Sequence, residues 1–75
     1  MIETTTVEVV IETTTVEVLL VSSEIGHNVV IKFNGRVFER SEVFADYDVA
    51  SMFCDDISRR VMEIAAKHRG TVDAK

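Results

Sequence analysis

Apolar and polar residues alternate or cluster in short stretches through the first half of the chain, and recur at three- and four-residue spacing in the second half. Short alternating or apolar stretches predict β-strands, and three- and four-residue spacing predicts an amphipathic helix. Residues 2–21, 29–33 and 36–44 are rich in the Val, Ile, Thr and Phe that favour strands. We therefore predict an α+β fold, in which a three- to four-stranded antiparallel sheet precedes one long C-terminal helix.

The first predicted strand region, residues 2–21, contains a duplication. Residues 2–9 and residues 11–18 have the same sequence, Ile-Glu-Thr-Thr-Thr-Val-Glu-Val. No Gly, Asn, Asp or Pro lies between the copies, so a tight hairpin joining them is not expected. The offset of nine residues is odd, so one uninterrupted strand would present the same side chains of the two copies to opposite faces.

Three arrangements of the two copies remain open. One copy could occupy a strand while the other hangs free, both could form one long bulged strand, or the spare copy could pair with a neighbouring molecule. The second copy continues directly into Leu19 and Leu20, so we predict that it fills the strand position within the molecule. The first copy would then extend outward, which makes Val7, Val9 and Ile11 candidates for contact with another chain.

A β-hairpin is predicted over residues 28–44, after a polar loop at residues 22–28. Asn34-Gly35 is the strongest two-residue hairpin signal, because a type I′ turn requires positive φ at both positions. This register places Ile31 opposite Phe38. The predicted core face of the hairpin consists of Val29, Ile31, Phe33, Phe38 and Phe44. The other face carries Val30 and Val37, more apolar side chains than a solvated face requires, and these two are further interface candidates.

Residues 46–69 are predicted to form the helix, with an acidic start at Asp46 and a C-terminal signature that ends at Gly70. The apolar stripe predicted to face the core consists of Val49, Met52, Phe53, Ile57, Val61, Ile64 and Ala65. Residues 70–75 are predicted to be a loose tail. Seventy-five residues are enough for one domain, which we assign to residues 1–75.

The reactive side chains of the helix do not suggest a catalytic site. Cys54 has no His near it in the sequence, so a small buried thiol is expected and a nucleophile is not. Asp55 and Asp56 are adjacent, and adjacent helical side chains diverge by about 100°, so they do not converge on a metal. Their expected role is to form ion pairs with Arg59 and Arg60 four residues later.

The remaining candidate ligands are also isolated. His27 and His68 are far apart, and the single cysteine does not supply the ligand spacing of a zinc site. We therefore expect no catalytic, cofactor-binding or metal-binding residues, and we predict that the protein is not an enzyme.

The charge of the chain is unevenly distributed. The net charge is −5, and residues 1–27 contain five Glu but no Lys or Arg, whereas residues 28–75 contain eight basic and eight acidic side chains. This distribution argues against a nucleic-acid partner, which requires a basic surface. No apolar run reaches the roughly 20 residues that span a bilayer, so no membrane partner is expected. A lone cysteine and an N-terminus without basic residues favour a cytoplasmic location.

The small size of the domain bears on its partners. A domain this short buries only roughly 60% of its unfolded surface and commonly depends on a disulfide, a metal or a partner chain. One cysteine cannot form an internal disulfide, and the sequence has no metal-ligand spacing, so a partner chain is the remaining means of stabilisation. We predict a non-enzymatic interaction protein that self-associates as a homodimer. The alternative is a small acidic regulator or inhibitor whose Glu-rich arm binds a basic site on a larger protein.

Overall fold

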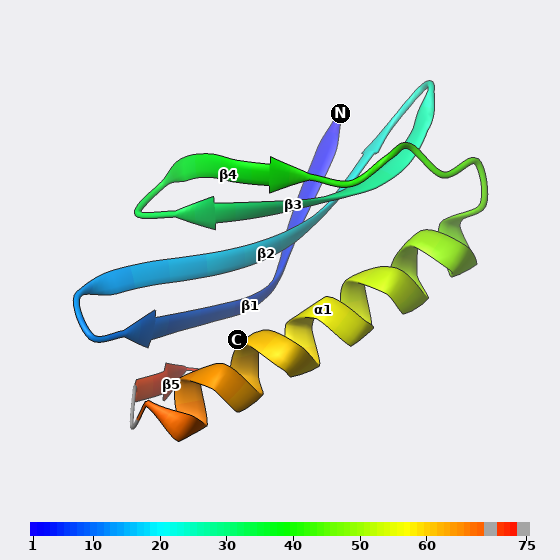
Figure 1. The fold of residues 1–75 in the computed structure, drawn as a ribbon. Coiled ribbons are helices and arrows are strands. Elements are labelled where there is room, and N and C mark those ends of the chain that lie inside the picture. Colours follow the sequence, from blue (N-terminus) through cyan, green and yellow to red (C-terminus); the bar gives the residue numbers. More distant parts are fainter. Residues whose placement is uncertain (69–70, 74–75) are drawn as a thin grey trace.

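The computed structural model describes residues 1–68 and 71–73, which form one antiparallel sheet and one helix. The elements in chain order are β1 (Ile2–Ile11), β2 (Thr14–Ser23), β3 (Gly26–Phe33), β4 (Arg36–Arg40), α1 (Tyr47–Lys67) and β5 (Thr71–Asp73). The strand order across the sheet is β4-β3-β2-β1-β5, and α1 crosses one face of it (Figure 1). The predicted α+β fold is confirmed, with four antiparallel strands before α1, and the short strand β5 follows the helix.

The β3–β4 hairpin forms at the predicted turn. Asn34 and Gly35 have φ values of 51° and 83°, as a type I′ turn requires, and Phe33 lies opposite Arg36. Beyond this pair an irregularity shifts the register, so that Ile31 lies opposite Glu39 and not opposite Phe38 as predicted. Because of this bulge, Phe38 is 61% exposed and stacks on Phe33. The prediction that Phe38 belongs to the core is therefore wrong.

The two identical segments occupy neighbouring strands. The first copy lies in β1 and the second in β2, and the two strands pair antiparallel through a two-residue turn at Glu12 and Thr13. The prediction that no tight hairpin joins the copies is wrong, and so is the prediction that only the second copy holds a strand position. Glu12 adopts a φ of 58°, a conformation that costs a non-glycine residue roughly 1–2 kcal/mol. Strand pairing and burial therefore outweigh an unfavourable turn.

The register gives this hairpin a local two-fold symmetry. Glu8 lies directly opposite Glu17, and these residues occupy the same position in the two copies. Val9 lies opposite Val16, and Val7 lies opposite Val18. Because the turn reverses the chain, the valines of both copies point to the same face, although their odd spacing would separate them in one continuous strand.

The loop and tail predictions are also revised. The loop predicted at residues 22–28 is a two-residue turn, because β2 extends to Ser23 and β3 begins at Gly26. Of the tail predicted to be loose over residues 70–75, residues 71–73 form β5, which pairs with Glu8–Val10 of β1. Residues 70, 74 and 75 lie outside the described part of the chain.

Helix α1 starts as predicted but packs only in part through the predicted face. The Asp46 carboxylate accepts a hydrogen bond from the backbone N–H of Asp48 at 2.8 Å and caps the N-terminus. The buried helical residues are Ala50, Cys54, Ser58 and Ala65. The predicted stripe is confirmed in part, because Ile57, Val61 and Ala65 face the core. Its other members are exposed, namely Val49, Met52, Phe53 and Ile64. The helix ends at Lys67, and the predicted end at residues 69–70 lies outside the described residues.

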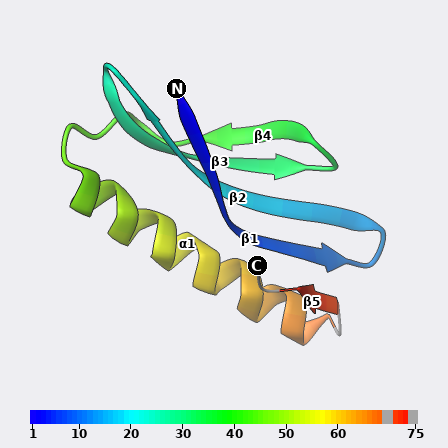
Figure 2. The same ribbon diagram turned by 180° about the vertical axis from the view of Figure 1, so that it is seen from behind.

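The core lies between α1 and the face of the sheet that α1 covers (Figure 2). The strand residues of this core are Val7, Val9, Val16, Val18, Leu20 and Val29. The small side chains on the buried face of α1 allow the helix backbone to approach the strands closely, and Ile57, Val61 and Met62 pack beside them. Small residues therefore set the orientation of the helix, and larger apolar residues flank them.

Candidate interaction surface

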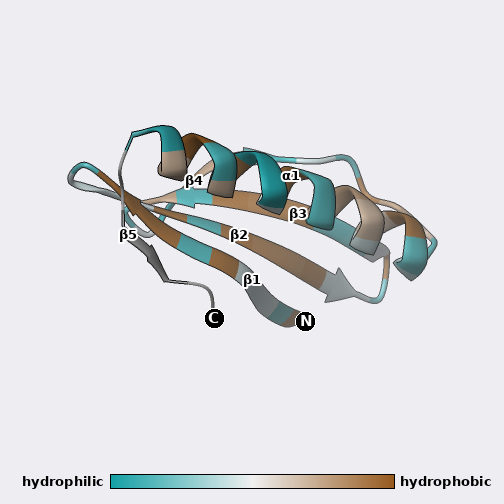
Figure 3. Cartoon of the chain, turned by 90° about the horizontal axis from the view of Figure 1, so that it is seen from below, coloured by the Kyte–Doolittle hydropathy of each residue, from teal (hydrophilic) through white to brown (hydrophobic). Residues whose placement is uncertain are grey.

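The strands bury apolar side chains on both faces of the sheet, although α1 lies on only one of them (Figures 1 and 2). Leu19, Val21 and Val30 form a cluster separate from the core, on the face opposite the helix. We call this surface the open face. Along β2, residues 18–21 are all buried, because they point alternately to the core and to the open face. Figure 3 shows a long hydrophobic stretch along this strand.

The open face is hollowed into a groove of about 490 Å³. Its floor is made by Leu19, Val21 and Val30, each less than 9% exposed. The more exposed apolar side chains that line the groove are Met1, Ile25, Val37 and Val43. Grooves of this size, with an apolar floor and polar groups around it, are typical of binding surfaces. The groove is therefore the leading candidate for a site of contact.

Charged side chains divide the open face into an acidic side and a basic side. Strand alternation places Glu3, Glu8 and Glu17 on the open face of β1 and β2. Lys32 on β3 and Arg40 on β4 line the groove on the other side. The open face therefore has acidic groups on β1 and β2 and basic groups on β3 and β4, and the two sets meet at the cross-strand partners Glu17 and Lys32, beside the apolar floor.

The predicted interface residues separate into two groups. Val7 and Val9 are 5% and 1% exposed and lie in the core beneath α1, and Ile11 packs against the same core. Within one molecule these three side chains therefore pack beneath α1 and not on the outer surface, because the first copy is an internal strand. Val30 and Val37 both lie on the open face, one in the floor of the groove and the other 45% exposed beside it.

Sequence reasoning missed Leu19 and Val21, the other two floor residues of the groove. The available signal was the uninterrupted apolar run at residues 18–21. Such a run is typical of a strand that is buried on both faces. From the sequence, Leu19 and Val21 are assigned to no face, so they do not appear among the predicted interface residues.

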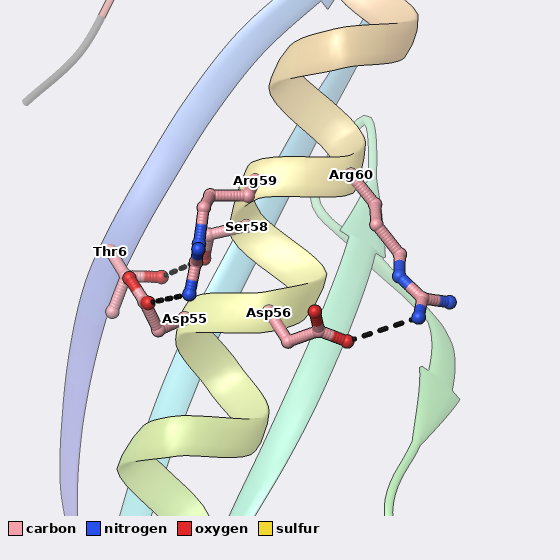
Figure 4. Close-up of polar contacts among 6 residues, drawn as sticks. All are labelled: Thr6, Asp55, Asp56, Ser58, Arg59 and Arg60. Carbon is pink, nitrogen blue, oxygen red and sulfur yellow. Dashed lines mark hydrogen bonds and ion pairs between the residues drawn. The ribbon is translucent and has the colours of Figure 1, made fainter.

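The polar residues nearest the core form a structural contact between β1 and α1 (Figure 4). The Thr6 hydroxyl donates to the backbone carbonyl of Val18 at 3.0 Å, and its oxygen lies 2.9 Å from the Ser58 hydroxyl. The Cys54 thiol lies 3.4 Å from the same oxygen and is 1% exposed, so the prediction of a small buried thiol is confirmed. Thr6 sits at the bulge in β1, which turns this extra residue toward the helix.

The paired aspartates of α1 point away from each other toward separate arginines (Figure 4). Asp55 contacts Arg59 at 2.6 Å, and Asp56 contacts Arg60 at 3.3 Å. All four side chains are more than half exposed. The predicted ion pairs are confirmed, and their exposure limits each to a small contribution to stability.

A serine and a histidine come together at the opposite end of β2. Ser22 and His27 are cross-strand partners, and the serine hydroxyl lies 2.8 Å from the Nδ1 atom of the ring. The His27 ring also meets Tyr47 edge-on, with centroids 5.3 Å apart. These contacts join the β2–β3 turn to the start of α1, which is a structural role.

The two histidines are separated along the helix. His27 contacts the first residue of α1, and His68 caps its last turn, so a 21-residue helix holds them about 30 Å apart. Within residues 1–68 and 71–73, no group of three or more His, Cys, Asp or Glu side chains is placed to hold a metal ion.

A smaller groove of about 190 Å³ separates α1 from β3 and β4. Phe53 and Ile57 line it from the helix, and Val29 and Ile31 line it from the sheet. This groove is the outer margin of the core, where the helix diverges from the β4 edge. It lacks the charge division of the open face.

Comparison of the chain with models of known families, with curated proteins and with solved structures found no match. In the part of the chain that the structure describes, no helix is both long enough and apolar enough to cross a membrane.

Proposed function

We propose that the protein is a non-enzymatic interaction protein that forms a homodimer by packing two open faces together. The observation that carries this proposal is the burial of β2 on both faces, where Leu19 and Val21 form a second apolar layer opposite the core. Strands with this pattern normally lie between two packed layers. The described chain supplies one layer, α1, and a second copy would supply the other.

The charge division of the open face favours a second copy of the same chain as the occupant. In a two-fold symmetric dimer, each partner contributes the same surface in the opposite orientation. The acidic groups Glu3 and Glu17 of one copy would then lie over Lys32 and Arg40 of the other. Such complementarity fixes the register of two faces and disfavours other orientations.

The size of the face is compatible with this dimer. The molecule measures 37 × 21 × 19 Å along its principal axes, so its broadest face is 37 × 21 Å. A stable dimer buries about 800 Å² on each partner, which is comparable to one whole face of this sheet. Aligned packing of two sheets at about −30° would bring the two grooves together.

Sedimentation velocity of the full chain over a range of concentrations tests the proposal. We expect a dimer, and we expect Val37→Glu to weaken it at least tenfold, because the carboxylate enters an apolar contact twice in each dimer. Met52→Glu is the matched control, because Met52 is 73% exposed on the helix and away from the open face. A wild-type monomer at every concentration, or a dimer indifferent to Val37→Glu, would contradict the proposal.

The acidic-regulator alternative is favoured by one observation, the presentation of Glu3, Glu8 and Glu17 on one face of a single hairpin. It predicts that a basic partner protein binds the acidic side of the open face and that the chain alone is monomeric. Glu3→Gln with Glu17→Gln would abolish such binding. In the homodimer, the same pair of substitutions would weaken association and leave the fold intact.

A further inference from the structure

The turn between the two copies is poorly suited to its position. Glu12 holds a φ of 58° although it is neither Gly, Asn nor Asp, and Thr13 is a β-branched residue that favours strands. Residues 2–23 contain no glycine, asparagine, aspartate or proline, so the whole segment has the composition of one continuous strand. Short strained hinges between strong strands favour the exchange of elements between molecules.

We infer that β1 exchanges between two copies of the chain, which form a second, domain-swapped dimer in which Glu12 and Thr13 are extended. In this form β1 of each copy pairs with β2 of the other and takes the place of the other copy's β1 beneath α1. Every contact that β1 makes within one molecule is then made between two molecules. The monomer and the swapped dimer therefore differ only in the conformation of Glu12 and Thr13 and in the new pairing of these residues between the two chains.

The register of the hairpin continues without interruption in the swapped form. Val10 pairs with Thr15 and Ile11 with Thr14 in the monomer. Extending this register between two chains places Glu12 of one copy opposite Thr13 of the other, and the reverse pair follows by symmetry. The hinge residues leave the turn and gain strand pairing, and Glu12 no longer requires a positive φ.

The spacing of the core residues keeps the two helices of the swapped dimer from colliding. Val9 and Val16 are seven positions apart, so in one extended strand they point to opposite faces. Val9 of one copy and Val16 of the other remain partners on the same face, as they are in the monomer. The two helices therefore cover opposite faces of the shared two-stranded ribbon and do not overlap.

In the swapped dimer, the two copies contact each other where β1 pairs with β2 and packs beneath α1. In the homodimer proposed above, they contact each other through the open face. Neither inference depends on the other. They also respond to different substitutions, because Val37 lies on the open face of β4, which β3 separates from the β1–β2 hairpin that contains the hinge. The two forms of association can therefore be distinguished in the same full-length protein.

A disulfide between direct strand partners reports which molecule supplies β1. Val10 and Thr15 are cross-strand partners, and side chains in such pairs are close enough for a disulfide. The double variant Val10→Cys, Thr15→Cys is unfolded, refolded at high and at low protein concentration, and oxidised. Non-reducing electrophoresis then separates monomers with an internal disulfide from covalent dimers. The parent chain, whose single Cys54 is buried, is the control.

We expect covalent dimers that increase with the protein concentration during refolding. Adding Glu12→Asn and Thr13→Gly, which install a favourable two-residue turn, should eliminate them. Deleting residues 12 and 13 removes the turn and should convert the whole population to dimer. Adding Val37→Glu should leave the covalent dimers unchanged.

An internal disulfide at every refolding concentration would overturn the inference. If those internally bonded molecules still sediment as a dimer that Val37→Glu dissociates, the exchange is excluded while the open-face dimer stands. A folded, monomeric deletion variant would also overturn the exchange. If the deletion variant does not fold, the cysteine pair in the chain with its native hinge decides the question.

Discussion

The β1–β2 and β3–β4 hairpins are held together by different parts of their structure. The β3–β4 turn has the favourable residues Asn34 and Gly35, but every residue of β4 is exposed. The β1–β2 turn places Glu12 at a φ of 58°, but its strands are ten residues long and bury Val9 and Val18 almost completely. A favourable turn can therefore hold short exposed strands, and long buried strands can impose an unfavourable turn.

The largest expected effect concerns the buried strands of the first hairpin. Val9 and Val18 hold the same position in the two copies and are 1% and 0% exposed. Val9→Lys and Val18→Lys should each destabilise the domain by more than about 4 kcal/mol, because a charge is placed in the core. Circular dichroism should show both variants unfolded at room temperature, since small domains have only about 5 kcal/mol of stability.

Phe38→Lys is the control in the second hairpin, where the side chain is 61% exposed and the variant should remain folded. A folded Val9→Lys protein together with an unfolded Val18→Lys protein would show that only the second copy is an integral strand. That result would contradict the hairpin described here.

The next effect concerns the favourable turn of the second hairpin. Gly35 has a φ of 83° and open space around it, so a substitution there acts through the backbone alone. Gly35→Val should lower the free energy of unfolding by about 1–2 kcal/mol, the cost of a left-handed conformation for a residue with a Cβ atom. Urea denaturation measures the change, and Thr13→Val in the first hairpin should leave the stability within about 0.5 kcal/mol of the parent.

The unfavourable turn of the first hairpin should respond in the opposite direction. Glu12→Gly should raise the free energy of unfolding by about 0.5–1 kcal/mol, because relief of the left-handed strain exceeds the entropy that glycine loses on folding. The midpoint of urea denaturation should rise without a change in slope. A lower midpoint would mean that the turn does not strain the hairpin.

The smallest effect is expected at the exposed aromatic pair of the second hairpin. Phe33 and Phe38 stack with ring centroids 4.3 Å apart, but both are accessible to solvent. Phe38→Ala should cost about 0.5 kcal/mol, the lower end of the range for aromatic pairs. A loss above about 2 kcal/mol would show that β4 depends on this stack and not on its turn.

The sequence predicted the features that local chemistry determines, namely the strand-rich first half, the Asn34-Gly35 turn and the helix start at Asp46. It failed where tertiary contacts outweigh local preference. The β1–β2 hairpin forms because the burial of both strands exceeds the cost of Glu12 at positive φ. The helix face was predicted only in part because a pattern of large apolar residues does not reveal that small residues allow the closest packing.

The candidate surface was predicted in part, for a related reason. Val30 and Val37 were identified because the Asn34-Gly35 turn fixes which face of β3 and β4 they occupy. Val7 and Val9 were assigned to an interface because the first copy was expected to lie outside the molecule. Their burial follows from the pairing of β1 with β2, a contact that depends on the whole sheet and not on the segment itself.

The identity of the two copies has a consequence for how the chain folds. During folding, β3 meets two segments with the same eight residues, and the residues after each copy distinguish them. Leu19, Leu20 and Val21 follow the second copy, and all three are buried in the final sheet. Pairing β3 with the first copy would place Glu12 where Val21 is buried, at the cost of removing a carboxylate from water. That decoy register is therefore short-lived, and the third residue after each copy, Val21 or Glu12, determines which of the two identical segments β3 selects.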